Sequence, residues 1–212
     1  LARQNRWIYE RVGVTDPLDP EDYLRHGGLA GLKNALAVSG DAVVDIITTS
    51  GLRGRGGAGF PAGIKWRTVA EQSAQPHAGE SRDATPHKYI CVNADEGDSG
   101  TFADRMLMEG DPFCLLEGMT IAAHAVGADR GLVYLRSEYP DAIATLQAAI
   151  HIARERHWLG DDILGSKVAF DVEIRVGAGS YVCGEETAML ESLEGRRGMV
   201  RAKPPLPAIK GL

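Results

Sequence analysis

Cysteine is scarce in this sequence, and the few cysteines present are poorly spaced for metal binding or cross-linking. Three of the 212 residues are cysteine, and Cys91, Cys114 and Cys183 are far apart without a CxxC pair. A structural zinc site or a disulfide framework requires a richer and more regular cysteine pattern. We therefore expect neither, and we expect each cysteine to act as a small buried hydrophobic residue.

Long apolar runs and basic clusters are also missing. No stretch approaches the roughly 20 apolar residues that span a bilayer, and residues 1–13 lack the apolar core of a signal peptide. Lysine and arginine total 23 against 29 aspartate and glutamate, which gives a formal charge of -6. No basic run is available to follow a nucleic-acid backbone. These absences predict a cytoplasmic protein with no direct membrane insertion and no nucleic-acid partner.

The composition that remains is typical of a globular protein. Hydrophobic residues make up 44% and charged residues 25% of the chain, enough to bury one sizeable core. The chain begins at Leu1 rather than Met and reaches Leu212 without an obvious closing element, so we expect it to be part of a longer subunit. We divide it into an N-terminal helical segment, residues 1–50, and a second domain, residues 51–212, that is incomplete at its C-terminus.

Within the N-terminal segment, residues 20–28 and 40–52 carry short helical patterns. In the second of these, Gly51 ends an apolar stripe. The stripe comprises Val43, Val44, Ile46 and Ile47.

Strand-like and helix-like segments alternate after residue 87. Strands are predicted within residues 88–97, 131–140 and 169–177, and helices within residues 111–128, 140–160 and 184–195. The first helix has Asp111 as a candidate N-cap, Pro112 at its first position and Gly127 as its stop. The second has an apolar face of Ile143, Leu146, Ile150 and Ala153. This alternation predicts an α/β fold, a parallel sheet flanked by helices, with its ligand at the carboxyl ends of the strands.

A glycine-rich run occupies residues 51–63, and residues 73–87 beyond it are predicted to be a surface loop. The run contains the spacing GxGxxG, but a Rossmann fingerprint requires a preceding strand, a following helix and an acidic residue about 20 positions later. Here the preceding segment is predicted to be helical and Pro61 follows at once. A Walker A loop is also excluded because no Gly-Lys-Ser/Thr follows. The remaining interpretations are a plain loop, or glycines that allow backbone N–H groups to approach an anion beside Arg53, Arg55 and Lys65.

Two acidic stretches lie at predicted strand ends. Residues 93–112 contain Asp95, Glu96, Asp98 and Asp104, and residues 177–195 place Glu185 and Glu186 at a helix start. The paired glutamates are explained equally by a complement to the helix dipole. The acidic residues 93–112 are explained equally by a solvated surface or a divalent-metal site. Because these stretches and the glycine run accompany neighbouring parallel strands, we favour one shared nucleotide pocket.

Together the three stretches resemble a known family. Residues 54–66, 93–112 and 177–208 closely resemble the flavin-binding subunit of the respiratory complex I family. That family includes the NADH-binding subunit of complex I and the diaphorase subunits of NAD-reducing hydrogenases and of soluble NAD-dependent formate dehydrogenases. Residues 93–128 look most like the beta subunit of the formate dehydrogenases.

The resemblance implies a Rossmann-like domain of unusual type that binds FMN non-covalently, with NADH beside it. The residues expected along the FMN phosphate and ribityl chain are Gly54, Arg55, Gly56, Gly57 and Lys65. Those expected at the flavin are Asn93, Asp95, Glu96 and Gly184.

The same resemblance implies an NADH site. Phe60 matches an aromatic residue that stacks on the adenine, and the residues expected around the nicotinamide and riboses are Asp98, Tyr181, Glu185, Glu186 and Lys203. We place Glu96 and Glu185 at the catalytic centre, although hydride transfer between stacked cofactors needs no general base. Paired carboxylates would repel a 2′-phosphate, which favours NAD(H) over NADP(H). No metal ligand is assigned within this chain.

The implied activity is NADH:acceptor oxidoreduction. Family members continue into a ubiquitin-like domain and a helical domain that holds a 4Fe-4S cluster. The implied partners are an iron–sulfur gamma subunit and a formate-oxidising molybdenum or tungsten subunit, or else hydrogenase or complex I subunits. The alternatives are a respiratory complex I subunit, a non-catalytic nucleotide-binding scaffold, an ion-pumping electron-carrier subunit and a metal-dependent hydrolase.

Overall fold

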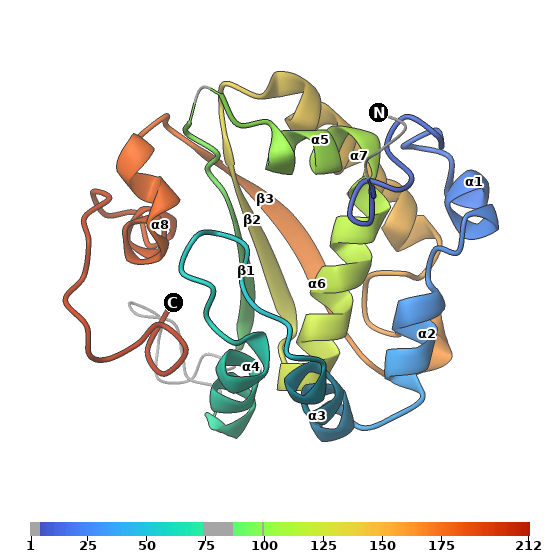
Figure 1. Cartoon of the computed structure of the whole chain (residues 1–212), viewed down its shortest axis with the longest axis horizontal. Coiled ribbons are helices and arrows are strands. Elements are labelled where there is room, and N and C mark those ends of the chain that lie inside the picture. The colour runs from blue at the N-terminus through green and yellow to red at the C-terminus, as the bar shows by residue number, and fades with distance from the viewer. Residues whose placement is uncertain (1–4, 74–86, 99) are drawn as a thin grey trace.

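A parallel three-stranded sheet forms the centre of the computed structural model, which describes residues 5–73, 87–98 and 100–212. The strands are β1 (Tyr89–Ala94), β2 (Arg130–Arg136) and β3 (Asp171–Gly177), in the order β1-β2-β3 (Figure 1). The parallel register pairs Cys91 with Leu132 and Leu132 with Glu173. The predicted α/β fold with a parallel sheet is confirmed. Most of the predicted surface loop at residues 73–87 lies outside the described residues.

Helices account for most of the remaining structure. The α-helices are α1 (Pro20–Arg25), α2 (Ala30–Leu36), α3 (Gly40–Ser50), α4 (Ala62–Glu71), α5 (Ala103–Gly110), α6 (Pro112–Val126), α7 (Pro140–Glu155) and α8 (Glu186–Leu193). Two short 3-10 helices are η1 (Ile163–Gly165) and η2 (Tyr181–Gly184).

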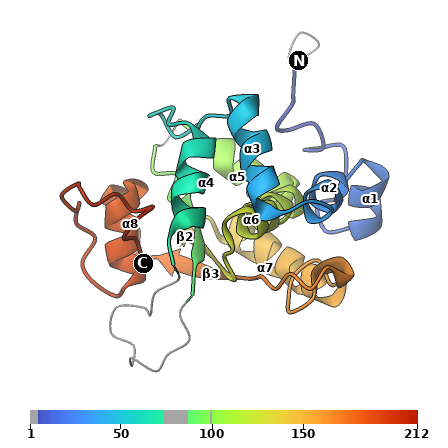
Figure 2. The same cartoon turned by 90° about the horizontal axis from the view of Figure 1, so that it is seen from below.

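Helices cover both faces of the sheet. Along β2, Val133 and Leu135 are buried in the main core, to which α6 and α7 contribute. Tyr134 points the opposite way, into a smaller cluster with Met189 and Leu190 of α8. This alternation follows from the two-residue period of a strand. Figures 1 and 2 show α8 apart from the helices of the main core in both views.

Helix α6, which directly precedes β2, has the predicted ends and the predicted N-cap residue. Pro112 begins α6, and Gly127 ends it in the left-handed conformation with φ 70°. Asp111 occupies the N-cap position without a side-chain capping bond. Its carboxylate instead accepts a hydrogen bond from Arg11 Nε at 2.8 Å. The predicted N-cap position of Asp111 is confirmed, but its side chain binds Arg11 instead of capping the helix.

The apolar faces of α3 and α7 are largely as predicted. Leu146, Ile150 and Ala153 of α7 are buried, and so are Val43 and Val44 of α3. Ile46 is 60% exposed, which corrects its place in the stripe. At about 100° per residue, Val43, Val44 and Ile47 share one arc of the helix, whereas Ile46 falls about 60° outside it.

The cysteines are free thiols with unequal burial. Cys183 is buried, whereas Cys91 and Cys114 are only partly buried. The expected role as a fully buried residue therefore holds for Cys183 alone. Burial raises the pKa of the Cys91 thiol to about 12, with Lys65 opposing the shift.

Two helices occupy segments for which the sequence analysis predicts no helix. Helix α4 begins directly after Pro61, which is its N-cap residue, so a helix does follow the glycine run. Proline suits a helix start because it needs no N–H partner there. Helix α5 occupies residues 103–110 of the acidic stretch. The Rossmann-turn interpretation is still disfavoured, because α3 rather than a strand precedes the glycines.

Helices α3 and α4 pack closely at Gly63. A methyl group placed on Gly63 would lie 2.3 Å from Thr48 Oγ1 and 2.6 Å from Thr48 Cα. We expect Gly63→Ala to lower the free energy of unfolding by about 1–3 kcal/mol through overpacking. Gly118→Ala in α6 is the matched control, since its methyl group would meet nothing within 4 Å. Urea denaturation measures both, and equal effects of the two substitutions would contradict the packing argument.

The N-terminal segment shares the main core with the rest of the chain. Tyr23, Leu32 and Val44 are buried there with residues of α6 and α7. The division at residue 50 stays a prediction. Within the described residues, no helix is both long and apolar enough to cross a bilayer.

Candidate functional site

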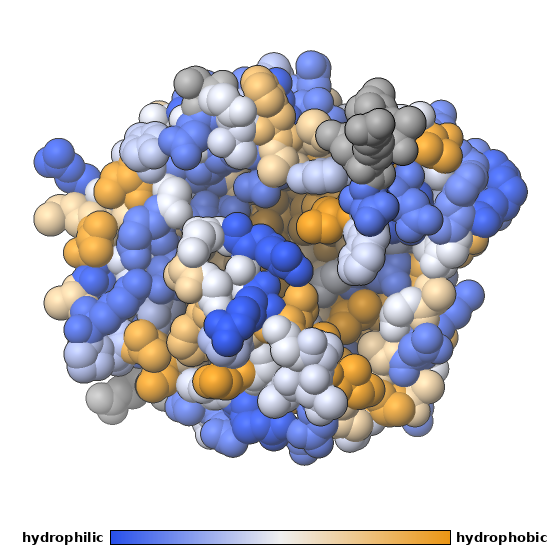
Figure 3. Space-filling view, viewed as in Figure 1, coloured by the Kyte–Doolittle hydropathy of each residue, from blue (hydrophilic) through white to orange (hydrophobic). Residues whose placement is uncertain are grey.

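The glycine loop between α3 and α4 is a closed turn with exposed backbone. Gly54 N–H donates to the Phe60 carbonyl at 2.9 Å, and the Arg53 guanidinium donates to the Gly59 carbonyl at 2.9 Å. Gly57 and Gly59 have φ values of 104° and 60°, which side chains other than glycine rarely adopt. The loop borders a surface hollow of ≈ 470 Å³. Hydrophilic side chains gather over this loop on the face shown in Figure 3.

The predicted phosphate-side residues are open to a ligand. Arg55 and Lys65 are exposed, and a methyl group on Gly56 would meet nothing within 4 Å. The Phe60 side chain is 49% exposed. These positions together form a cationic, glycine-lined surface.

The end of β1 is tied to the segment that precedes α8. Asn93 Nδ2 donates to the Gly184 carbonyl at 2.9 Å, and its Oδ1 accepts from Asp95 N–H at 3.1 Å. A methyl group on Gly184 would lie 3.4 Å from the Asp95 carbonyl oxygen. Three residues predicted to lie at one ligand are therefore neighbours, although 91 positions separate Asn93 from Gly184.

Glu96 is buried and organises the start of α5. Its two carboxylate oxygens each accept a 3.1 Å hydrogen bond, from Asp104 N–H and from Arg105 N–H. The backbone carbonyl of Glu96 accepts a hydrogen bond from Tyr139 Oη. Both oxygens of the carboxylate are thus engaged with the helix N-terminus, where a negative charge is favourable. Burial and the Glu96 charge raise the pKa of the neighbouring Asp104.

Glu185 is the N-cap of α8. Its Oε2 accepts hydrogen bonds from Thr187 N–H at 2.8 Å and Ala188 N–H at 3.0 Å. Its Oε1 accepts a 3.2 Å hydrogen bond from Lys203 Nζ. Although partial burial opposes it, these hydrogen bonds hold the pKa of Glu185 below its ordinary value.

A chain of alternating charges joins α8 to the helix that follows the glycine loop. Lys203 Nζ donates to Glu186 Oε1 at 2.6 Å, and Lys65 Nζ lies 3.8 Å from Glu186 Oε2. The hydrogen bond to Glu186 is the largest cause that raises the pKa of Lys203. Lys65 belongs to α4, so this contact brings the first and third predicted motifs together.

Asp98 and Tyr181 form the outer part of the same region. Tyr181 Oη donates to Asp98 Oδ1 at 2.8 Å, and this bond raises the pKa of the tyrosine. Tyr181 is 66% exposed. An exposed ring that is fixed by a hydrogen bond offers a surface on which a planar ligand can stack.

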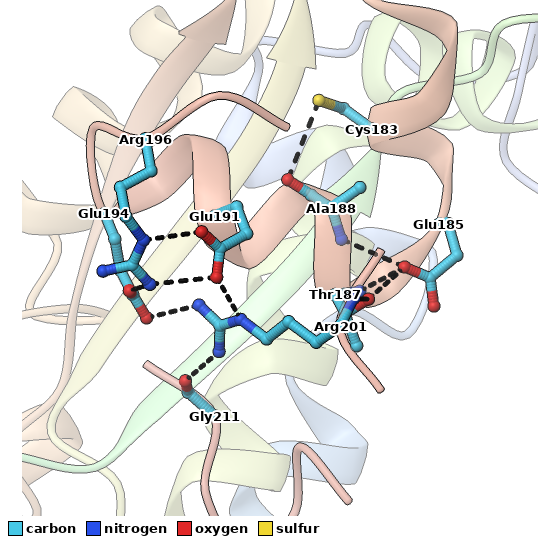
Figure 4. A network of polar contacts seen from close by, with 9 residues as sticks. All are labelled: Cys183, Glu185, Thr187, Ala188, Glu191, Glu194, Arg196, Arg201 and Gly211. Carbon is cyan, nitrogen blue, oxygen red and sulfur yellow. Dashed lines mark hydrogen bonds and ion pairs between the residues drawn. The ribbon is translucent and has the colours of Figure 1, made fainter. Parts of the chain in front are cut away.

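The segment that carries Lys203 is anchored by an arginine that the sequence patterns do not single out. Figure 4 shows Arg201 between α8 and the C-terminal residues. Its guanidinium donates to Glu191 at 2.5 Å, to Glu194 at 2.7 Å and to the Gly211 carbonyl at 2.8 Å. Its backbone N–H donates to Thr187 Oγ1 at 2.8 Å. Arg201 therefore fixes the chain two residues before Lys203.

Arg136 and Tyr139 are also absent from the residues predicted for the site. Arg136 is the last residue of β2 and Tyr139 follows three positions later. Both contact the acidic segment after β1. The available signal is the polar run from Arg136 to Tyr139 at the end of a predicted strand, which is the same signal that identifies residues 93–98. Among the described residues, no group of three or more His, Cys, Asp or Glu side chains could hold a metal ion.

The fold and the grouped motifs define the class of this chain as an α/β nucleotide-cofactor domain. Within that class, it belongs to the Nuo51 FMN-binding domain family, whose model matches residues 47–212. The resemblance to the flavin-binding subunits is confirmed, and FMN is the cofactor in this family's description.

Several relatives carry names that agree with this family. The chain is 49% identical over 206 residues to an NADH-quinone oxidoreductase subunit of Rhizobium meliloti, covering 97% of this chain and 46% of the relative. It is 46% identical to "NADP-reducing hydrogenase subunit HndC" of Solidesulfovibrio fructosivorans, covering 99% of this chain and 40% of the relative. The chain thus spans less than half the length of these two relatives.

A solved structure supports the same assignment. A chain from an NAD⁺-reducing [NiFe]-hydrogenase in the H2-reduced state aligns with a TM-score of 0.71 and 36% identity. The alignment covers 96% of this chain and 31% of that one.

Proposed function

We propose that this chain is the nucleotide-binding part of a diaphorase subunit, an NADH:acceptor oxidoreductase that transfers hydride between NAD(H) and FMN. The observation that carries the proposal is the convergence of three distant motifs. Asn93 Nδ2 contacts the Gly184 carbonyl at 2.9 Å, and Lys65 Nζ lies 3.8 Å from Glu186. A glycine loop, a buried acidic strand end and a helix N-terminus with paired carboxylates thus belong to one region.

The residues present fit FMN. The phosphate needs cations and approachable backbone N–H groups, which Arg55, Lys65 and the open position at Gly56 supply. The polar ring edge needs buried hydrogen-bonding partners, and Asp95 Oδ2 is a buried oxygen without a hydrogen-bond partner in the described structure. A buried carboxylate oxygen in that state favours a ligand beside it.

Each side chain has a proposed task at the flavin. Gly54, Gly56 and Gly57, with Arg55 and Lys65, bind the phosphate and ribityl chain. Asn93 and Asp95 orient the ring, Gly184 leaves room for it, and Glu96 keeps the supporting turn rigid through its bonds to α5. FMN, when bound, supplies the chemistry by accepting two electrons with a hydride and releasing electrons one at a time.

The proposed NADH site lies on the exposed side of the same region. Phe60 and Tyr181, 49% and 66% exposed, offer ring faces for the adenine and the nicotinamide end. Glu185, Glu186, Asp98 and Lys203 bind ribose hydroxyls and orient the nicotinamide, with Glu185 nearest the reacting atoms. Lys203 pairs with Glu185 and Glu186, and Lys65 pairs with Glu186. Because these lysines partly neutralise the two glutamates, we propose a preference for NAD(H) over NADP(H) that is weaker than unpaired carboxylates would give.

We further propose that the enzyme to which this subunit belongs is an NAD-dependent formate dehydrogenase. The resemblance of residues 93–128 to the beta subunit of those enzymes supports this proposal. The two curated relatives belong by name to quinone-reducing and hydrogenase systems, so complex I and hydrogenase assemblies are the competing assignments. In each case we propose that the full-length subunit passes electrons through a 4Fe-4S cluster to partner subunits in the cytoplasm.

An absorbance spectrum of the full-length protein tests the proposal. We expect flavin bands that bleach when NADH is added without oxygen, together with NADH:ferricyanide activity. A colourless protein that neither takes up FMN nor shows this activity would overturn the proposal and favour a scaffold. Replacing NADH with NADPH tests the nucleotide preference. Supplying formate or hydrogen to the purified complex distinguishes a formate dehydrogenase from a hydrogenase.

A further inference from the structure

Arg136 is a buried cation beside the proposed flavin site with no role assigned so far. It is the last residue of β2, and Asp95 immediately follows β1, its neighbour in the sheet. Their side chains are 14% and 1% exposed, and Arg136 Nε lies 3.8 Å from Asp95 Oδ1. The two opposite charges are therefore removed from water together.

The pair is close without being hydrogen-bonded. Asp95 Oδ2 and Arg136 Nε are both buried and have no hydrogen-bond partner in the described structure. An arginine that serves only to neutralise an aspartate normally binds it through two parallel hydrogen bonds. Here the guanidinium compensates the charge and leaves the carboxylate oxygen unused, an arrangement that suits an oxygen reserved for a ligand.

The rest of the guanidinium bridges two segments of the site. Nη2 donates to Glu138 Oε1 at 2.7 Å, and this bond holds the pKa of Glu138 at about 2. A methyl group placed on Gly97 would lie 2.7 Å from Arg136 Nη1 and 2.6 Å from the Tyr181 ring. Arg136 thus lies beside the turn that connects Asp95 to Asp98 and near Tyr181 at the start of η2.

We propose that Arg136 is a positioning residue of the flavin site, which holds the buried Asp95 carboxylate and the Gly97 turn in the geometry that binds FMN. This inference rests on the proposed function. Burial raises the pKa of Asp95, and the charge of Arg136 opposes that rise. Removing the guanidinium therefore leaves a buried carboxylate without its cation, which disfavours the ionised form.

A double-mutant cycle on the full-length subunit tests the proposal, with FMN affinity measured by quenching of FMN fluorescence. We expect Arg136→Met to weaken FMN binding by about 30-fold, which corresponds to ~2 kcal/mol. Arg136→Lys keeps the charge and should recover part of the affinity. Glu138→Gln removes the exposed partner and leaves the Asp95 contact, so it should bind FMN within about twofold of the unsubstituted protein.

The cycle identifies the residue through which Arg136 acts. If it acts through Asp95, Arg136→Met should weaken binding by less than about threefold in an Asp95→Asn background, because the uncompensated carboxylate is already gone. The absorption bands of bound FMN should shift in Arg136→Met, since the field at the ring changes. Thermal unfolding of each variant separates these effects from a loss of folding, and Arg136→Lys covers the case in which Arg136→Met does not fold.

The outcomes are distinct. If the unsubstituted protein does not bind FMN, the proposed function fails and the inference fails with it. If that protein binds FMN and Arg136→Met binds it equally well, only the inference is overturned. Additive losses in the Asp95→Asn background would also overturn it, because Arg136 would then act independently of Asp95.

Discussion

Lys65→Glu is expected to weaken FMN binding by at least about 100-fold, or ~2.7 kcal/mol. Lys65 is exposed near the start of α4, next to the glycine loop, and its Nζ lies 3.8 Å from Glu186. Reversing its charge removes a proposed phosphate ligand and places a second carboxylate beside Glu186. Two like charges near 4 Å repel by about 1–4 kcal/mol at a protein surface, and the FMN phosphate would meet the same repulsion. Quenching of FMN fluorescence on titration with the apoprotein measures the affinity.

Two further variants show whether the effect is local. Lys65→Gln removes the cation without adding a carboxylate, so it should fall between the unsubstituted protein and Lys65→Glu. Lys33→Glu, on the exposed surface of α2, makes the same change in net charge. Figures 1 and 2 show α2 apart from the glycine loop between α3 and α4, so this variant should leave FMN affinity unchanged. Raising the salt concentration should reduce the differences in FMN affinity between these variants, because salt screens the charge interactions. An unchanged dissociation constant in Lys65→Glu would refute the phosphate role.

Substitution of Glu185 should separate ligand binding from helix capping. Glu185→Gln keeps an oxygen that can accept from Thr187 and Ala188 N–H, but it loses the charge that faces Lys203. We expect the apparent KM for NADH to rise about 10- to 30-fold, because a charge-assisted hydrogen bond worth ~1.5–2 kcal/mol is lost. The free energy of unfolding should change little. Glu185→Ala should show the same rise and an additional loss of about 1 kcal/mol in unfolding free energy, because the cap is gone. An unchanged KM in both variants would remove Glu185 from the NADH site.

The capping contribution should also depend on pH in a defined direction. Because the pKa of Glu185 is lower in the folded protein than its ordinary value of 4.5, the folded state binds fewer protons in that range. The stabilisation is therefore present above about pH 4.5 and is lost as the pH falls through the lower folded value. The difference in unfolding free energy between the unsubstituted protein and Glu185→Ala should narrow below that pH.

The sheet and the long helices could be predicted from the sequence because their signals are local. The run from Tyr89 to Ala94 is β-branched and apolar, and Pro112 and Gly127 mark both ends of α6. Helix α4 could not be predicted from Pro61 alone, because proline breaks a helix interior but is equally suited to a helix start. Ile46 is apolar like its neighbours, and only its angle around the helix axis places it outside the core.

The contacts of the site could be predicted only in part. Residues 93–98 and 184–186 are identified by clustered acids and glycines, but their meeting through Asn93 and Gly184 depends on the tertiary fold. Arg201 carries no local signal that distinguishes it from surface arginines, and Arg136 has only the polar run at the end of its strand. Both are important because of partners distant in sequence, such as Asp95 and Gly211. The capping hydrogen bonds of Glu96 and Glu185 likewise can be predicted only when the first residue of each helix is known exactly.

The hydrogen bond from Asn93 to Gly184 has a consequence for biosynthesis. The ribosome releases chain from the N-terminus, and domains form in that order. The amide of Asn93 is synthesised 91 residues before its acceptor, so β1, β2 and β3 must all leave the exit tunnel before the bond can form. Contacts between residues so far apart in sequence also slow folding. Cofactor loading is therefore expected to be a late step during translation, and a pulse of FMN given to stalled nascent chains should be retained only once α8 has emerged.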